Sequence, residues 1–171
     1  MTARSFALIL GIFYLGFAIL SMMPGFVTPM PPSAPPTRFD VMHGALLGLF
    51  PVNMLLTLVH LSMGAWGLAA FMGWSGARFY ARSAAVIFAA LGVMGLTRGL
   101  DTLLGAMPLH GHDVWLHLAS AGFAAFVGWT QRSGERRSFG AERRKASRSP
   151  IGNERRQGRF ERRRSDHIPT A

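Results

Sequence analysis

Four long apolar stretches occupy most of the first 130 residues, and they constrain the fold more than any other feature of the chain. They span about residues 6–23, 51–74, 84–104 and 114–130. A helix that crosses the hydrocarbon core of a bilayer needs about 20 predominantly apolar residues, and each stretch comes close to that length. The sequence therefore predicts an all-α integral membrane protein with four transmembrane helices in a domain that covers residues 1–130.

Basic residues indicate how these helices are oriented. Arg4 precedes the first stretch, Arg78 and Arg82 follow the second, and 13 of the 18 basic residues lie in residues 131–171. All of them fall on one side if four helices alternate in direction, and short loops rich in Lys and Arg face the cytoplasm. We therefore expect a multi-pass protein of the bacterial inner (plasma) membrane with both termini cytoplasmic. A signal peptide is the alternative for the first stretch, although that stretch is long and no A-x-A cleavage site follows it.

Residues 131–171 form a second segment with 13 basic and five acidic residues and few large apolar ones. Such a composition cannot bury enough apolar surface to offset the entropy of ordering, which predicts a disordered, Arg-rich cytoplasmic tail. Because the tail begins at the membrane, we expect anionic lipid headgroups to be its partner, through residues 132–164. Its charge alone would also permit nucleic-acid binding, but no aromatic-lined binding fold accompanies it.

Most of the prolines lie in the loops that are expected on the side opposite the basic residues. Six of the ten lie in residues 24–40, which predicts an extended, polyproline-like external loop. Pro51 and Pro108 stand where the second and fourth helices are expected to begin, which is the helical position that proline tolerates best.

A short motif occurs twice. Residues 47–52 and 104–109 both follow the pattern L-G-x-x-P-[VL], and a His-Leu pair begins nine residues after each proline, at His60 and His117. The offset between the copies is 57 residues throughout. The pattern favours two repeated helical hairpins, with a chance match in an apolar, low-complexity sequence as the alternative.

Four segments carry a resemblance to a known family. They are GIFYLGFAILSMMPG, LLGLFPVNMLLTLVHLSMGAWGLAA, the AR-Y-AR turn and PLHGHDVWLHLA. Over roughly residues 8–130 the chain resembles a bacterial family of small membrane proteins, domain-of-unknown-function family 4383. The resemblance implies four transmembrane helices and no activity. The chain departs from the family where N-x-L-H-N-L-V-H is usual, since Leu56 and Thr57 stand at the middle polar positions, and where an asparagine often stands in place of His110.

Five ionisable residues fall in the predicted helices or at their outer ends: His60, Arg98, Asp101, Asp113 and His117. Such residues are costly in a membrane and suggest function by default. Arg98 and Asp101 would share one helix face, as would Asp113 and His117, and Asp113 could instead cap its helix. The first interpretation is a buried polar network that joins the helices and needs no cofactor.

A haem site is one alternative interpretation. His60 and His117 come from different helices at comparable positions after their prolines. Two imidazoles that face each other across a helical bundle could hold a b-type haem, with Arg98 beside a propionate.

A metal site at the external end of the fourth predicted helix is another alternative interpretation. A proton or small-solute pathway through the same polar residues is a third. His110, His112 and Asp113 lie close together in the sequence and could bind a divalent metal, zinc or copper, with His117. The absence of cysteine excludes disulfides and thiolate ligands. Because no catalytic triad order, P-loop or H-E-x-x-H motif is present, we expect a non-enzymatic envelope component.

Overall fold

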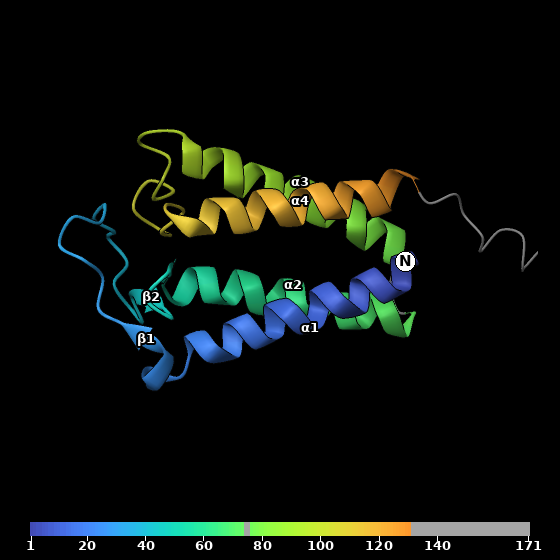
Figure 1. Cartoon of the computed structure of the whole chain (residues 1–171), viewed down its shortest axis with the longest axis horizontal. Coiled ribbons are helices and arrows are strands. Elements are labelled where there is room, and N and C mark those ends of the chain that lie inside the picture. Colours follow the sequence, from blue (N-terminus) through green and yellow to red (C-terminus); the bar gives the residue numbers. More distant parts are fainter. Residues whose placement is uncertain (74–75, 131–171) are drawn as a thin grey trace, which may run out of the picture. The chain divides into compact units, whose positions relative to one another are not determined.

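The computed structural model describes residues 1–73 and 76–130. The predictions for the basic tail concern residues outside this part. The described chain contains four long helices, α1 (Ala3–Ser21), α2 (Met54–Met72), α3 (Ala77–Leu96) and α4 (His112–Thr130). In Figure 1 their axes run roughly side by side, and the N-terminus lies at the end opposite the strands. The predicted mostly helical architecture is therefore confirmed.

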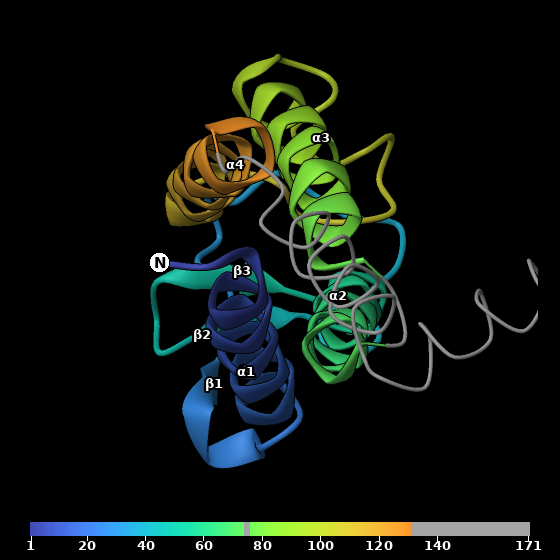
Figure 2. The same ribbon diagram turned by 90° about the vertical axis from the view of Figure 1, so that its right-hand side faces the viewer.

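The helices pack as two antiparallel pairs. α1 makes its most extensive contacts with α2, and α3 with α4, as Figures 1 and 2 show from the side and along the bundle. α1, α2 and α3 are long and apolar enough to cross a membrane. α4 has the same length as α1 and α2 but does not reach that apolarity, because it carries Asp113, His117 and Ser120 along one face.

A small antiparallel sheet caps one end of the helices, and the all-α prediction did not include it. A 3-10 turn, η1 (Pro24–Phe26), leads into β1 (Val27–Thr28), which pairs with β2 (Gly44–Leu46), which in turn pairs with β3 (Phe50–Val52). We call residues 22–53, which join α1 to α2, the cap. The loop was expected to be extended throughout, but η1 and the three strands give it regular structure.

Neither proline of the repeated motif opens a helix, contrary to the prediction. Pro51 lies in β3, opposite Ala45; proline is tolerated there because β3 is an edge strand. α2 begins instead after Asn53, whose side-chain oxygen accepts a hydrogen bond from the backbone N–H of Leu56 at 3.0 Å. Pro108 lies in the loop before α4, which begins at His112.

The third helix also differs from the prediction. α3 ends at Leu96, whereas the apolar stretch continues to residue 104. Arg98 and Asp101 therefore lie in the turns after the helix and do not share a helix face. Asp113 lies inside the first turn of α4 rather than at its N-cap.

The buried positions of the helices repeat with constant offsets. α2 buries seven residues, and adding 57 to each gives seven of the eight buried residues of α4. Adding 74 to the buried residues of α1 from Phe6 to Ala18 gives those of α3 from Tyr80 to Gly92. Under these offsets His60 corresponds to His117 and Tyr14 to Phe88. This burial pattern supports two repeated hairpins related by an approximate two-fold axis.

The turns that precede α2 and α4 repeat as well. Leu47 and Leu104 have φ angles of 53° and 58°, and the glycines that follow them, Gly48 and Gly105, have φ angles of 70° and 91°. A leucine with positive φ is uncommon because its Cβ is crowded in the left-handed region. The same strained pair at an offset of 57 indicates that both copies of the motif form the same turn.

Candidate functional site

His60 and His117 meet where the two hairpins come together. His60 lies in the second turn of α2 and His117 in the second turn of α4, and both side chains are fully buried. Their Nε2 atoms are 3.3 Å apart. One ring must donate its Nε2–H to the other, because a neutral imidazole has one donor and one acceptor nitrogen. The two histidines of the repeat are therefore in direct contact.

Asp113 extends this contact on one side. It lies one helical turn before His117, so both side chains project from the same face of α4. Its Oδ2 atom is 3.2 Å from Nδ1 of His117, and Asp113 is also fully buried. The geometry allows a close ion pair but not an aligned hydrogen bond, and both carboxylate oxygens lack a hydrogen-bond partner among the described residues. His60, Asp113 and His117 together form a buried cluster of possible metal ligands, which we call the histidine–aspartate cluster.

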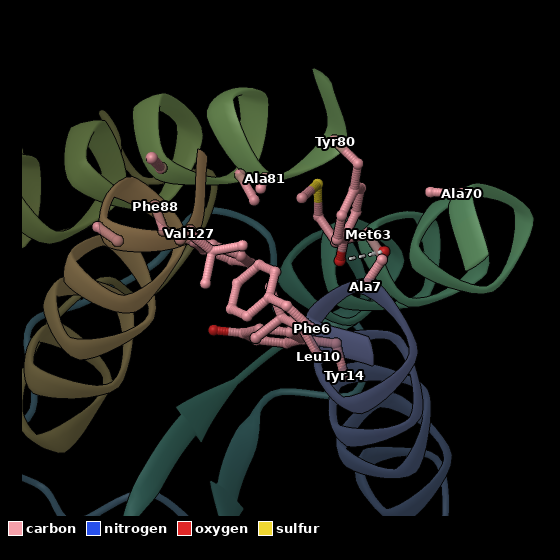
Figure 3. Close-up of a cluster of buried hydrophobic side chains, with 14 of the residues drawn as sticks. Phe6, Ala7, Leu10, Tyr14, Met63, Ala70, Tyr80, Ala81, Phe88 and Val127 are labelled. Carbon is pink, nitrogen blue, oxygen red and sulfur yellow. Dashed lines mark hydrogen bonds between the residues drawn. The ribbon is translucent and has the colours of Figure 1, made fainter. Parts of the chain in front are cut away.

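Aromatic rings enclose both imidazoles. Tyr14 of α1 and Phe88 of α3 stack on each other with centroids 4.5 Å apart, and both rings are labelled in Figure 3. Tyr14 also lies 5.0 Å from the His60 ring, and Phe88 lies 5.5 Å from the His117 ring. These two contacts correspond to each other under the offsets of the repeat. One aromatic ring therefore lies against each imidazole in equivalent positions, and His60 has a further edge-on contact with Phe17, whose counterpart in α3 is Leu91.

Three polar side chains, Tyr14, Ser120 and Asn53, fix the surroundings of the cluster. The hydroxyl groups of Tyr14 and Ser120 are hydrogen-bonded at 2.7 Å, which joins α1 to α4. The Asn53 amide donates to the carbonyl oxygens of Ala106, at 2.7 Å, and Phe39, at 3.1 Å. Because Asn53 also caps α2, these bonds set where α2 begins and hence the depth of His60. None of these three residues was among the predicted site residues, although a tyrosine within an apolar run and an asparagine before a helix were visible signals.

The other predicted site residues lie elsewhere. Arg98 is exposed beyond the end of α3, and no ion pair or hydrogen bond joins it to another described residue. His112 is exposed and its ring lies 6.3 Å from Phe50. His110 is half-buried in the loop before α4; burial lowers its pKa, and the nearby Asp101 carboxylate opposes that shift. The structure therefore groups Asp113 with His60 and His117, and not with His110 and His112.

The proposed polar network is also smaller than the predicted one. Of its five members, the structure brings together His60, Asp113 and His117, whereas Arg98 and Asp101 lie in the loop after α3. His60, Asp113 and His117 do not satisfy all of one another's hydrogen-bonding groups. Nδ1 of His60 and both oxygens of Asp113 lack hydrogen-bond partners in the described part of the chain. Buried polar groups are nearly always paired in proteins. A cluster of unpaired ones is therefore a candidate binding site.

Arginines mark the opposite end of the bundle. Arg4 donates to the carbonyl oxygen of Phe71 at 2.8 Å and 3.1 Å, and Arg82 donates to that of Gly128 at 2.9 Å. The two carbonyls correspond at an offset of 57 and lie in the last turns of α2 and α4. An arginine there satisfies a free carbonyl and complements the negative end of the helix dipole.

Three helices of membrane length and apolarity pack with α4 as two hairpins around the buried histidine–aspartate cluster, an arrangement compatible with a small helical membrane protein. The chain belongs to the family described as Domain of unknown function (DUF4383), whose model matches residues 4–130. The predicted family is therefore confirmed. No curated protein and no solved structure matches the chain.

Proposed function

We propose that this chain is an integral membrane protein that holds one transition-metal ion between His60 and His117, with Asp113 orienting His117 and balancing the charge. The observation that carries the proposal is the 3.3 Å approach of two fully buried Nε2 atoms from different hairpins, beside a buried carboxylate without a hydrogen-bond partner.

The distance fits a shared ion. Zinc–imidazole bonds are about 2.0–2.1 Å long, so two nitrogens on one tetrahedral ion lie about 3.3–3.4 Å apart. Metal-bound histidines commonly donate their other ring N–H to a carboxylate, which fixes the tautomer and the ring orientation. Asp113 lies beside that nitrogen of His117, with Oδ2 3.2 Å from Nδ1, but the two atoms are not aligned as a hydrogen bond in this structure.

Charge supports the same assignment. An ionised carboxylate in a dry interior is strongly unfavourable unless a cation compensates it, and no Lys or Arg forms an ion pair with Asp113 among the described residues. A divalent ion would supply that charge. Imidazole ligands suit zinc and copper. A haem is a poorer match, because its macrocycle would have to lie between two nitrogens that are already in contact.

Removing either histidine is expected to abolish metal binding. Purified protein should be stripped with chelator and reloaded with Zn²⁺, and metal content should be measured by mass spectrometry. Wild type should retain about one ion per chain, while His60→Ala and His117→Ala should retain none above background. An ion at 100 times its Kd adds about 2.7 kcal/mol to folding stability, so zinc should also raise the thermal unfolding midpoint of wild type only.

His43→Ala is the matched control, since His43 lies in the cap and pairs with Asp40 at 3.7 Å. It should bind zinc as wild type does. A wild-type protein that takes up neither zinc nor copper would contradict the proposal. The same atoms would then favour a second function, proton transfer along the Asp113–His117–His60 chain, which proton flux in vesicles would test.

We further propose that α4 crosses the membrane with the other three helices, with both termini on the cytoplasmic side of a bacterial inner membrane. Arg4 and Arg82 lie at the N-terminal end of the bundle, as positive charge on the cytoplasmic side requires. Reporter fusions after Met30, Ala77 and Gly105 and at residue 171 are expected to report outside, inside, outside and inside.

An external C-terminus would contradict that topology. With the C-terminus inside, the basic residues of 132–164 meet the anionic headgroups of the inner leaflet, where each contributes about 1 kcal/mol of attraction. The proposed lipid contact of the tail depends on this placement.

A further inference from the structure

The histidine–aspartate cluster lies near the capped end of the bundle. His60 is six residues after the start of α2 at Met54, and His117 is five residues after the start of α4 at His112. The other direction along the bundle is filled by large side chains: Phe88 and Tyr80 are fully buried, and Met63 is 4% exposed. Figure 3 shows these side chains packed against one another, with the Tyr80 hydroxyl bonded to the Met63 carbonyl oxygen. A route to the cluster through that packed core would require several helices to separate.

A continuous line of ring contacts leads from the cluster to the surface at the capped end. The Phe17 ring meets the His60 ring edge-on at 4.9 Å, and the Phe50 ring meets Phe17 at 5.4 Å. The ring of His112 lies 6.3 Å from Phe50. Exposure increases along this line, from His60 at 0% and Phe17 at 9% to a half-buried Phe50 and an exposed His112.

We propose that metal ions reach the histidine–aspartate cluster from the capped end, by way of His112 and past a gate formed by Phe50 and Phe17. This inference rests on the proposed metal site. His112 offers an exposed imidazole as the first ligand, and His60 offers the next one behind the two rings. Two phenylalanines offer an ion no donor atom, so they must turn aside for it to pass.

The structure makes Phe50 the movable member of the gate. It is the first residue of β3, an edge strand of three residues, and its ring is only half-buried. Phe17 lies near the C-terminal end of α1, and its side chain packs with Leu46 and Val52 of the sheet. Phe50 packs against the same hydrophobic cluster, but its ring is more exposed than that of Phe17, so we expect Phe50 to rotate first and Phe17 to follow.

Exchange kinetics test the gate separately from the site. Zinc-loaded protein in detergent should be mixed with excess chelator to measure release, and stripped protein with Zn²⁺ to measure loading. Phe50→Ala is expected to accelerate both by about tenfold, a factor that corresponds to about 1.4 kcal/mol of barrier, with unchanged affinity. His112→Ala should slow loading severalfold and leave the final stoichiometry at one ion per chain.

Phe13→Ala is the matched control. Phe13 also contacts Phe17, at 6.2 Å, but it is 45% exposed on the outer face of α1 and lies off the line to His112. It should exchange zinc at the wild-type rate. If Phe50→Ala does not fold, Phe50→Leu keeps an apolar side chain and should still accelerate exchange. Equal exchange rates in wild type and a folded Phe50 variant would overturn the gate while leaving the site intact, and failure of wild type to bind zinc would overturn both.

Discussion

Exchanging Leu56 and Asp113 between the two hairpins is expected to preserve metal binding, although Asp113→Leu alone should weaken it by about 10–100-fold, the usual effect of removing a carboxylate that orients a metal-bound histidine. Leu56 corresponds to Asp113 at the offset of 57, it is fully buried, and it precedes His60 by four residues as Asp113 precedes His117. Nδ1 of His60 has no hydrogen-bond partner in the described residues. A carboxylate at position 56 should therefore face that nitrogen and orient the other histidine.

The measurement is zinc affinity by chelator competition for the single variants and for the Leu56→Asp, Asp113→Leu double variant. The control moves the acid to a neighbouring buried position, in a Thr57→Asp, Asp113→Leu double variant. Because Thr57 corresponds to Val114 and not to Asp113 at the offset of 57, a carboxylate there should not orient the His60 ring as Asp113 orients His117, and it should not restore affinity. Equal weakness in both double variants would show that the repeat does not extend to the environment of the two imidazoles.

Gly67→Ala is expected to destabilise the protein by about 3 kcal/mol or more, at the upper end of the range for overpacking a tight interface. α1 and α2 approach closely there: a Cβ on Gly67 would lie 2.7 Å from the carbonyl oxygen of Ala7 and 2.7 Å from Cα of Gly11. Both neighbours are helix backbone, so neither can move aside without separating the two helices. Unfolding in mixed micelles, followed by circular dichroism, measures the change.

Gly122→Ala provides the comparison, since a Cβ on this α4 glycine meets no atom within 4 Å. In an exposed helical position alanine is favoured over glycine by about 0.8–1 kcal/mol, so this variant should be as stable as wild type or slightly more so. Similar losses in both variants would contradict close backbone packing as the cause.

The sequence was sufficient to predict four helices and to single out His60 and His117 as residues at equivalent positions. The apolar stretches are as long as the bilayer requires, and the offset of 57 placed His60 and His117 at equivalent positions. The end of α3 could not be predicted in the same way, because Leu100, Leu103 and Leu104 continue the apolar composition into the loop. Hydropathy alone does not distinguish a helix from an apolar turn.

The small sheet and the inward orientation of Asp113 could not be predicted from the sequence. β1, β2 and β3 have two or three residues each, too few for an alternating pattern to be recognised. An aspartate before an apolar helix usually caps it, and only the packing of α4 shows that this one points inward. Tyr14 and Phe88 were hidden for a similar reason: within apolar runs, a ring that lines a site has the same appearance as one that fills a core.

The cap has a consequence for how such proteins can diversify. The offsets of the repeat, 74 for α1 and α3 and 57 for α2 and α4, differ by 17 residues, and all of that difference lies in the connection that forms the cap. Change in the interior is thus more constrained, since nearly every buried helix position has a buried counterpart that must fit the same axis. Residues 47–53 of the cap repeat before α4, but the 17 extra residues have no counterpart, so their length and composition can change without disturbing the repeat. Under the proposed metal site, selectivity for the ion that enters can therefore evolve in the cap, while the donor atoms of the histidine–aspartate cluster stay fixed.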